Sequence, residues 1–103
     1  MRFRSMITAG AGGLLIASTT GAFAYSGEQF AKQANITLDQ ARAIAVKARP
    51  GQITDQELEK EGGGSGLRFS FDVKGKSGKT YEVGVDAKSG KVLENKAEGP
   101  NPD

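Results

Sequence analysis

Thr80 to Leu93 reads Thr-Tyr-Glu-Val-Gly-Val-Asp-Ala-Lys-Ser-Gly-Lys-Val-Leu, and it carries the clearest structural pattern in this chain. Its first half alternates apolar with polar or small residues, which is the period of a strand with one buried face. Asp86 to Gly90 has the composition of a turn, and strand-forming residues resume after it. The segment therefore predicts two antiparallel strands joined by a turn that begins with an aspartate, with Val92 facing Val85.

A second alternating run, residues 67–74, comes just before this segment. Pairing Phe71 with Val83 keeps every apolar side chain of the two runs on the same face, whereas a shift by one residue would reverse the faces. This register leaves residues 76–78 as a short loop whose last position is a glycine. We therefore expect a hairpin with one apolar face and one polar face.

Residues 53–61 form a predicted strand whose acidic side chains all share one parity. These acidic residues, called the acidic row below, are Asp55, Glu57, Glu59 and Glu61. Such a row is usually the solvated face of a strand, and charges on an edge strand also discourage aggregation. The alternative is that the acidic row forms a partner surface for a cation or a basic protein.

Leu58 has the opposite parity and is expected in the core. If Leu58 faces inward, Arg68 on the next strand lies opposite Glu59 or Glu61. The sequence therefore predicts an ion pair on the exposed face of the sheet. Because such a pair is solvated, it should contribute only about 0–1 kcal/mol.

A helix is predicted from Leu38 to Arg49. Thr37 and Gln40 have the spacing of a capping box, and Pro50-Gly51 ends the helix. The face that the helix turns inward is rich in alanine, so the helix can lie close to a sheet.

Together these elements predict an α+β fold, with one main helix packed on one face of an antiparallel β-meander of three to four strands. The strands are expected near residues 53–61, 67–74, 80–86 and 91–95. The predicted core consists of Leu38, Ala41, Ile44, Ala45, Leu58, Phe69, Phe71, Tyr81, Val83 and Val85.

Residues 1–24 have the features of a secretory signal peptide: Arg2 and Arg4, an apolar run, and Ala-Phe-Ala ahead of a predicted cleavage after Ala24. The apolar run is shorter than the roughly 20 residues that a membrane span needs. We therefore expect a periplasmic or secreted protein with no integral membrane segment after cleavage.

The composition divides the mature chain into three parts. Residues 25–35 are a polar lead, in which Ser26 and Gln29 have capping-box spacing, so a short helix is predicted there. Residues 36–95 form the predicted domain. Residues 96–103 contain two prolines and are expected to be a disordered tail.

The residue composition limits the chemistry of this protein. The chain contains no histidine and no cysteine, which removes the usual catalytic base, the thiol nucleophile and the common zinc and haem ligands. Two of the 14 basic residues lie in the predicted signal peptide, so the mature chain has equal numbers of acidic and basic residues, and nucleic-acid binding is not expected. We predict no enzyme activity, no cofactor and no metal site.

The turn that begins at Asp86 has two candidate roles. As a calcium loop it would need oxygen ligands at alternate positions, but Lys88 occupies one of them. As an Asx turn, the Asp86 carboxylate accepts backbone N–H groups two or three residues further on, and Gly90 takes a positive φ. The second interpretation makes Asp86 and Gly90 structural residues.

The sequence resembles the PepSY domain family from the predicted helix to the last predicted strand. Ile36-Thr37-Leu38-Asp39-Gln40-Ala41 is similar to the opening helix of that family. Tyr81-Glu82-Val83, followed by the residues from Val85 to Leu93, is similar to its closing strands and their aspartate-centred turn. The segment Gly62–Gly66 is longer than the family's tight hairpin.

The PepSY family occurs in the propeptides of thermolysin-like metallopeptidases and in small bacterial envelope proteins. The resemblance implies an α+β fold, no catalytic residues and a role in restraining peptidases. We therefore expect a non-enzymatic secreted or periplasmic protein-interaction domain that binds or restrains a peptidase. The alternative is a ligand- or signal-sensing accessory module that docks on a membrane or envelope partner.

Overall fold

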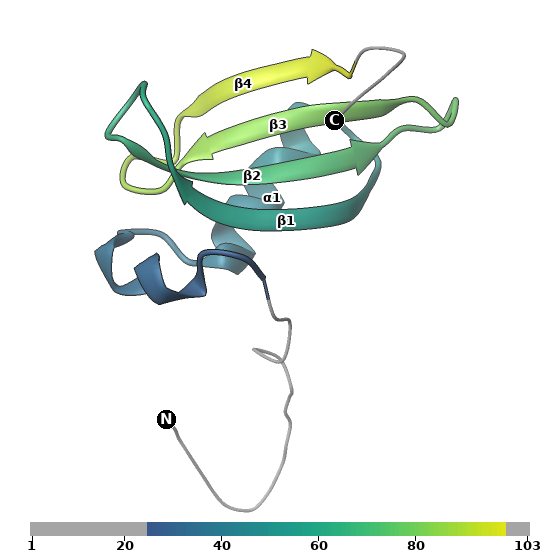
Figure 1. Cartoon of the computed structure of the whole chain (residues 1–103). Helices are drawn as coiled ribbons and strands as arrows, with labels where there is room; N and C mark the ends of the chain where they lie inside the picture. Colours follow the sequence, from purple (N-terminus) through teal and green to yellow (C-terminus); the bar gives the residue numbers. More distant parts are fainter. Residues whose placement is uncertain (1–24, 99–103) are drawn as a thin grey trace, which may run out of the picture.

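Figure 1 shows the computed structural model of the protein, which describes residues 25–98. In this part of the chain a short 3₁₀ helix and an α-helix are followed by four strands. Their bounds are η2, Glu28–Gln33; α1, Leu38–Ala48; β1, Gln52–Lys60; β2, Leu67–Lys74; β3, Thr80–Asp86; and β4, Val92–Ala97. The predicted signal peptide, with its cleavage after Ala24, lies outside the described residues. Within residues 25–98, no helix is long and apolar enough to cross a membrane.

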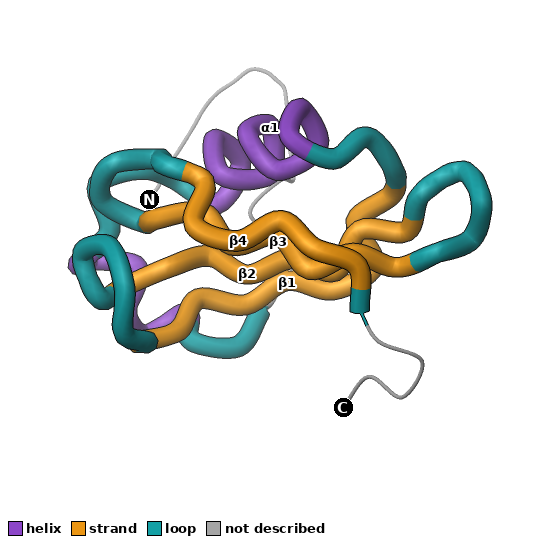
Figure 2. Tube along the Cα trace, turned by 90° about the horizontal axis from the view of Figure 1, so that it is seen from above, coloured by secondary structure: helices purple, strands orange, loops and turns teal. Residues whose placement is uncertain are grey.

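The four strands form one antiparallel sheet in the order β1-β2-β3-β4. Helix α1 packs on one face of this sheet, as Figure 2 shows from above. The opposite face, which we call the open face, is not covered by α1. The predicted α+β architecture, with one main helix on one face of an antiparallel meander, is therefore confirmed.

Helix α1 begins with the predicted capping box. The Thr37 hydroxyl accepts a hydrogen bond from the Gln40 N–H at 3.0 Å, and the Thr37 N–H donates to Gln40 Oε1 at 2.9 Å. Ala41 and Ala45 are completely buried, and their small side chains let the helix approach the sheet closely. The helix ends one residue earlier than predicted, because Arg49 already has an extended backbone.

Strands β2 and β3 pair in the predicted register, with Phe71 opposite Val83. The short loop between them has Gly78 at φ +88°, as its position predicts. The inward side chains of the two strands form the centre of the core, and none is more than 1% exposed: Phe69, Phe71, Val73, Val83 and Val85.

Strand β1 pairs with β2 so that Leu58 lies opposite Phe69. A β-bulge between Ile53 and Asp55 adds one residue to β1. Ile53 therefore packs against the core, although it shares its sequence parity with the acidic row. After the bulge the alternation is regular, which keeps Leu58 on the buried face and Asp55 on the open face.

Strand β4 pairs with β3 so that Val92 lies opposite Val85, as predicted. A second register shift follows at once, and it makes Leu93 the extra residue of a bulge. Glu94 therefore lies opposite Gly84 and belongs to the open face.

The C-terminal strand is longer than predicted. Residues 96 and 97, expected to begin a disordered tail, belong to β4, which ends at Ala97. Beyond the strand, the N–H of Glu98 donates to the carbonyl of Thr80 at 3.0 Å, which holds this end of the chain against β3. Residues 99–103 lie outside the described part of the chain.

The buried core consists of Ala41, Ala45, Leu58, Leu67, Phe69, Phe71, Val73, Val83, Val85 and Ala87. Leu38 and Ile44 pack against this core and are partly exposed.

Tyr81, which was predicted in the core, is only half-buried. The guanidinium carbon of Arg49 lies 3.9 Å from the centre of its ring. This arrangement covers the ring with a cation.

The lead segment pairs with the outer edge of β1. Ser26 forms a parallel bridge with Glu57, and the Ser26 carbonyl accepts the N–H of Leu58 at 2.8 Å. The 3₁₀ helix η2 follows, with Gly27 as its N-cap and no side-chain capping bond. The capping box predicted at Ser26 and Gln29 is therefore wrong, because Ser26 is part of the bridge to β1.

Two aromatic residues of the lead enlarge the core. The Tyr25 ring centre lies 6.4 Å from that of Phe69, and the Phe30 ring lies under the ammonium group of Lys60, which is 4.9 Å from the ring centre. Both rings pack against the buried residues. Neither residue was predicted in the core, because neither lies in a periodic segment of the sequence.

We expect Phe71→Ala to lower the free energy of unfolding by about 3–5 kcal/mol, because it removes a buried ring from the centre of the sheet. That loss is comparable to the whole stability of a small domain. Urea unfolding followed by circular dichroism measures it. Val46→Ala, on the exposed side of α1, is the control and should change stability by less than about 0.5 kcal/mol. An unchanged transition for Phe71→Ala would contradict the assignment of the buried face.

Candidate functional site

The acidic row lies along the β1 side of the open face. Parity places Asp55, Glu57 and Glu59 on this face, whereas Glu61 follows the strand and lies in the β1–β2 loop. Asp55 and Glu61 are exposed, and Glu57 and Glu59 are half-buried. None of the four forms an ion pair with another residue of the described chain. The fold thus brings three of the predicted surface residues together and leaves Glu61 beyond them.

Three further carboxylates, which were not among the predicted surface residues, lie on the open face. They are Asp72 on β2, Glu82 on β3 and Glu94 on β4. Asp72 lies directly opposite Glu82, a position in which like charges repel. Burial raises the pKa of Glu82, and the neighbouring charges of Glu94 and Asp72 raise it further. The open face is therefore an acidic surface in which carboxylates crowd one another.

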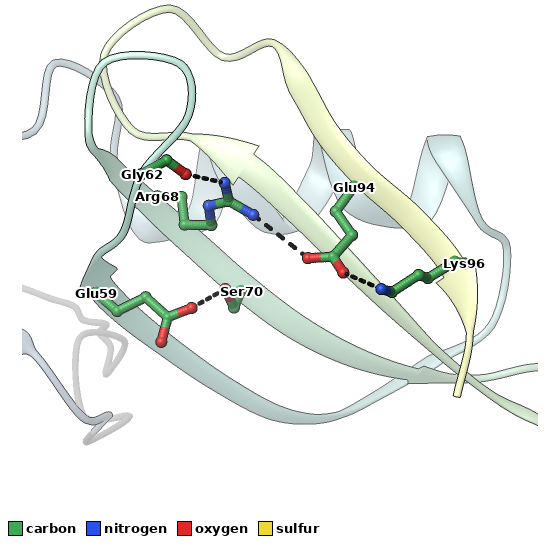
Figure 3. A network of polar contacts seen from close by, with 6 residues as sticks. All are labelled: Glu59, Gly62, Arg68, Ser70, Glu94 and Lys96. Atoms are coloured by element: carbon green, nitrogen blue, oxygen red, sulfur yellow. Dashed lines mark hydrogen bonds and ion pairs between the residues drawn. The ribbon is translucent and has the colours of Figure 1, made fainter. Parts of the chain in front are cut away.

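Arg68 lies on the open face beside the β1–β2 loop, and its side chain is only 9% exposed (Figure 3). Its Nη1 pairs with Glu94 Oε1 at 3.3 Å, and its Nη2 donates to the Gly62 carbonyl at 3.0 Å. Within the described residues its buried Nε has no hydrogen-bond partner. Glu94 Oε2 pairs in turn with Lys96 at 3.2 Å. A buried cation therefore offsets part of the negative charge of this face.

The predicted exposed ion pair between Arg68 and Glu59 or Glu61 is wrong. Glu59 lies opposite Arg68 in the register, but its carboxylate accepts a hydrogen bond from Ser70 Oγ at 2.8 Å (Figure 3). Arg68 turns the other way and crosses β3 at Gly84, where a Cβ atom would lie 3.2 Å from Nη1. Because Gly84 has no side chain, the guanidinium can cross β3 and reach β4.

The Asp86 carboxylate is buried and holds two loops together. Its Oδ1 accepts the N–H groups of Lys88 at 2.8 Å and Ser89 at 3.1 Å, which are the contacts of an Asx turn. The same carboxylate accepts the N–H of Ser65 at 2.7 Å and the Ser65 hydroxyl at 2.8 Å. Gly90 completes the turn at φ +79°. The contact with Ser65, which was not predicted from the sequence, connects the glycine-rich β1–β2 loop to the β3–β4 turn.

The hydrogen bonds also set the acidity of Asp86. Burial alone would raise the pKa of Asp86, but the hydrogen bonds from Lys88, Ser65 and Ser89 outweigh it and lower the pKa from 3.8 to about 2. The oxygens of this carboxylate are therefore occupied by internal donors. Across residues 25–98, no group of three or more histidine, cysteine or acidic side chains is arranged to hold a metal ion.

A groove of about 590 Å³ lies beside β1. Its lining residues come from the lead, α1 and the first half of β1: Tyr25, Ser26, Arg42, Ile53, Thr54, Asp55 and Gln56. The Arg42 guanidinium donates a hydrogen bond to the side-chain carbonyl of Gln56, which connects α1 to β1. A smaller crevice of about 280 Å³ is lined by Tyr25, Phe69, Ala31 of η2 and residues 34–38, which lead into α1. Tyr25 is therefore part of both hollows.

These features define a small α+β domain whose polar groups gather on one sheet face and in a groove at the sheet edge. The sequence matches the family described as Peptidase propeptide and YPEB domain, PepSY, over residues 35–96, which is more than half of the chain. The chain therefore belongs to the PepSY family. Comparison with curated proteins and with solved structures found no match.

Protonation of Asp86 should destabilise the protein in acid. The pKa of Asp86 is lower in the folded protein than its ordinary value, so its contribution to stability is complete above about pH 4 and is lost as the pH falls towards about 2. We expect a loss of about 1–2 kcal/mol over this range, measured by urea unfolding at each pH. Asp86→Asn cannot ionise at this position and should lack this part of the pH dependence.

The matched control for Asp86 is Asp55→Asn, which removes an exposed carboxylate from the same sheet. That variant should keep the pH profile of the wild-type protein. Parallel stability curves for the wild type and Asp86→Asn through the acid range would contradict the role assigned to this carboxylate.

Arg68→Ala should lower the free energy of unfolding by about 1–3 kcal/mol, more than an exposed ion pair is worth. The change leaves the half-buried Glu94 without its buried cation and removes the side-chain stem that covers Gly84. Lys96→Ala removes the other cation paired with Glu94, but its side chain is 69% exposed, so it should cost no more than about 1 kcal/mol. Equal unfolding free energies for the two variants would show that burial does not strengthen the Arg68 pair.

Proposed function

We propose that this protein is a non-enzymatic, periplasmic or secreted interaction domain that binds a peptidase and restrains it. Membership of a family described by peptidase propeptides supports this proposal. Export to the envelope follows from the predicted signal peptide with cleavage after Ala24. The observation that carries the proposal is the open face, a sheet surface that α1 leaves free and that is rich in carboxylates.

In this proposal the open face receives basic side chains of the peptidase. Asp55, Glu57 and Glu59 of the acidic row form one side of that surface, and Glu61 lies beyond them in the β1–β2 loop. The cations Arg68 and Lys96 are already paired with Glu94, so they do not neutralise the acidic row. A basic partner surface would relieve the repulsion among these carboxylates and would be steered towards them before contact.

Restraint of the peptidase would then come from surface coverage rather than from chemistry. The chain has no histidine or cysteine with which to ligate a catalytic zinc ion. The four-stranded sheet supplies the surface, and Asp86 holds together the two loops at one of its ends. In this arrangement Asp86 and Gly90 shape the domain, and the acidic row makes the contact.

The test is affinity capture with the mature protein on envelope and culture fractions of the organism that carries it, read as proteolysis of casein by the material eluted from the immobilised protein. We expect eluted proteolytic activity that falls when free mature protein is added back and that chelation abolishes if the partner is a metallopeptidase. Capture of a sensor or membrane protein without proteolytic activity would instead favour the accessory-module alternative.

Paired neutralisations provide the control for the surface. Asp55→Asn with Glu57→Gln removes two charges from the acidic row and should weaken capture by about tenfold. Asp39→Asn with Glu28→Gln removes two exposed charges from α1 and the lead and should leave capture unchanged. Equal weakening by both pairs would mean that only net charge matters, and the assignment of the open face would fall.

A further inference from the structure

The lead segment covers only part of the outer edge of β1. The N–H of Leu58 faces this edge and donates to the Ser26 carbonyl at 2.8 Å. Backbone groups alternate between the two edges of a strand, so the N–H of Gln56 faces the same way. In the described chain the Gln56 N–H has no backbone acceptor. Within residues 25–98, the edge of β1 therefore offers a donor that the lead does not pair with, at the point where the groove lies.

The groove beside this donor has a side towards α1, where Tyr25, Ile53 and the guanidinium of Arg42 line it, and an acidic side towards the open face. Ile53 packs against the core because of the bulge, and the Tyr25 ring lies 6.4 Å from the ring of a buried phenylalanine, so both present apolar surface. Asp55 lines the groove from the open face and has no ion-pair partner within the described residues. The volume of about 590 Å³ is large enough for a bulky side chain together with its backbone.

A strand added at this edge must obey the alternation of the sheet. Its side chains would point by turns towards Tyr25 and Ile53 and towards Asp55 and Glu57. The first set requires a large apolar or aromatic side chain, and the second set requires basic side chains. The groove thus selects an extended segment in which a bulky residue is flanked by lysine or arginine.

We infer that the groove beside β1 is a docking site for such an extended segment of a partner protein. The segment continues the line of the lead and accepts the N–H of Gln56 through one of its backbone carbonyls. This docking site deepens the proposed function, because it names the extended segment as the part of the partner that binds. The inference rests on the proposed function only for the identity of the partner. It applies to the chain that begins at Tyr25, after the predicted cleavage.

The probe is the synthetic peptide acetyl-Ala-Lys-Phe-Lys-Ala-amide, added to the mature protein from Tyr25 to Asp103. This chain retains every residue of the buried core. We expect saturable shifts of the amide resonances of Asp55, Gln56 and Leu58, and slower hydrogen exchange at the Gln56 amide. The peptide with glutamate in place of both lysines, and the peptide with serine in place of phenylalanine, should bind more weakly. Shifts confined to β4 or to η2, or equal binding of all three peptides, would overturn the inference.

Two substitutions at one position isolate the backbone donor. Gln56→Pro and Gln56→Ala both remove the side chain that contacts Arg42, but only proline removes the N–H. This N–H faces away from β2, so proline leaves the ladder between the two strands intact. Gln56→Pro should bind the lysine peptide about five- to tenfold more weakly than Gln56→Ala, the effect of one lost hydrogen bond. Equal affinities of the two variants would rule out strand addition at this edge.

The same variants separate this inference from the proposed function. If the peptide binds in the groove and no peptidase is captured, the docking site stands and the proposed function fails. If a peptidase is captured equally well by Gln56→Pro and Gln56→Ala, the proposed function stands and the groove is not its docking site.

Discussion

Burial of one sheet face against a single short helix is the constraint on which the rest of this structure depends. Helix α1 has only 11 residues, and Ala41 and Ala45 bring it close to β2 and β3. One such helix covers one side of a four-stranded sheet and no more, because a chain of this size has little apolar surface to bury. The other side must remain polar, so the alternation of each strand divides the domain into an apolar half and a charged half.

The parts of the fold that follow from local pattern could be predicted from the sequence. The register of β2 and β3 is one, because a slip by one residue would turn Phe71 and Val83 to the solvent. The capping box at Thr37 is another, since both of its partners lie within one turn of helix. A third predictable feature is the alternation along β1 that puts Asp55 and Glu57 on one face, and this alternation is regular after the bulge.

The parts that could not be predicted depend on choices between residues far apart in the sequence. Arg68 has Glu59 opposite it, yet it pairs with Glu94. Ser70 donates a hydrogen bond to Glu59, and Gly84 has no side chain to block the path across β3. The alternation of apolar and polar residues does not indicate which carboxylate Arg68 will choose. The same holds for Ser65, which reaches Asp86 only because the loop folds back over the end of β3. The acidic row of the candidate site could therefore be predicted from the sequence, whereas the burial of Arg68 and its pairing with Glu94 could not.

The docking of the lead has a consequence for what counts as the unit of folding. The family match begins at residue 35, yet Tyr25 and Phe30 lie ahead of it and pack against the core. A protein trimmed to residues 35–96 would expose the ring of Phe69 and leave the N–H of Leu58 without its partner. The segment that matches the family is thus shorter than the segment that packs against the core. The lead is part of the folded domain and not a linker that precedes it.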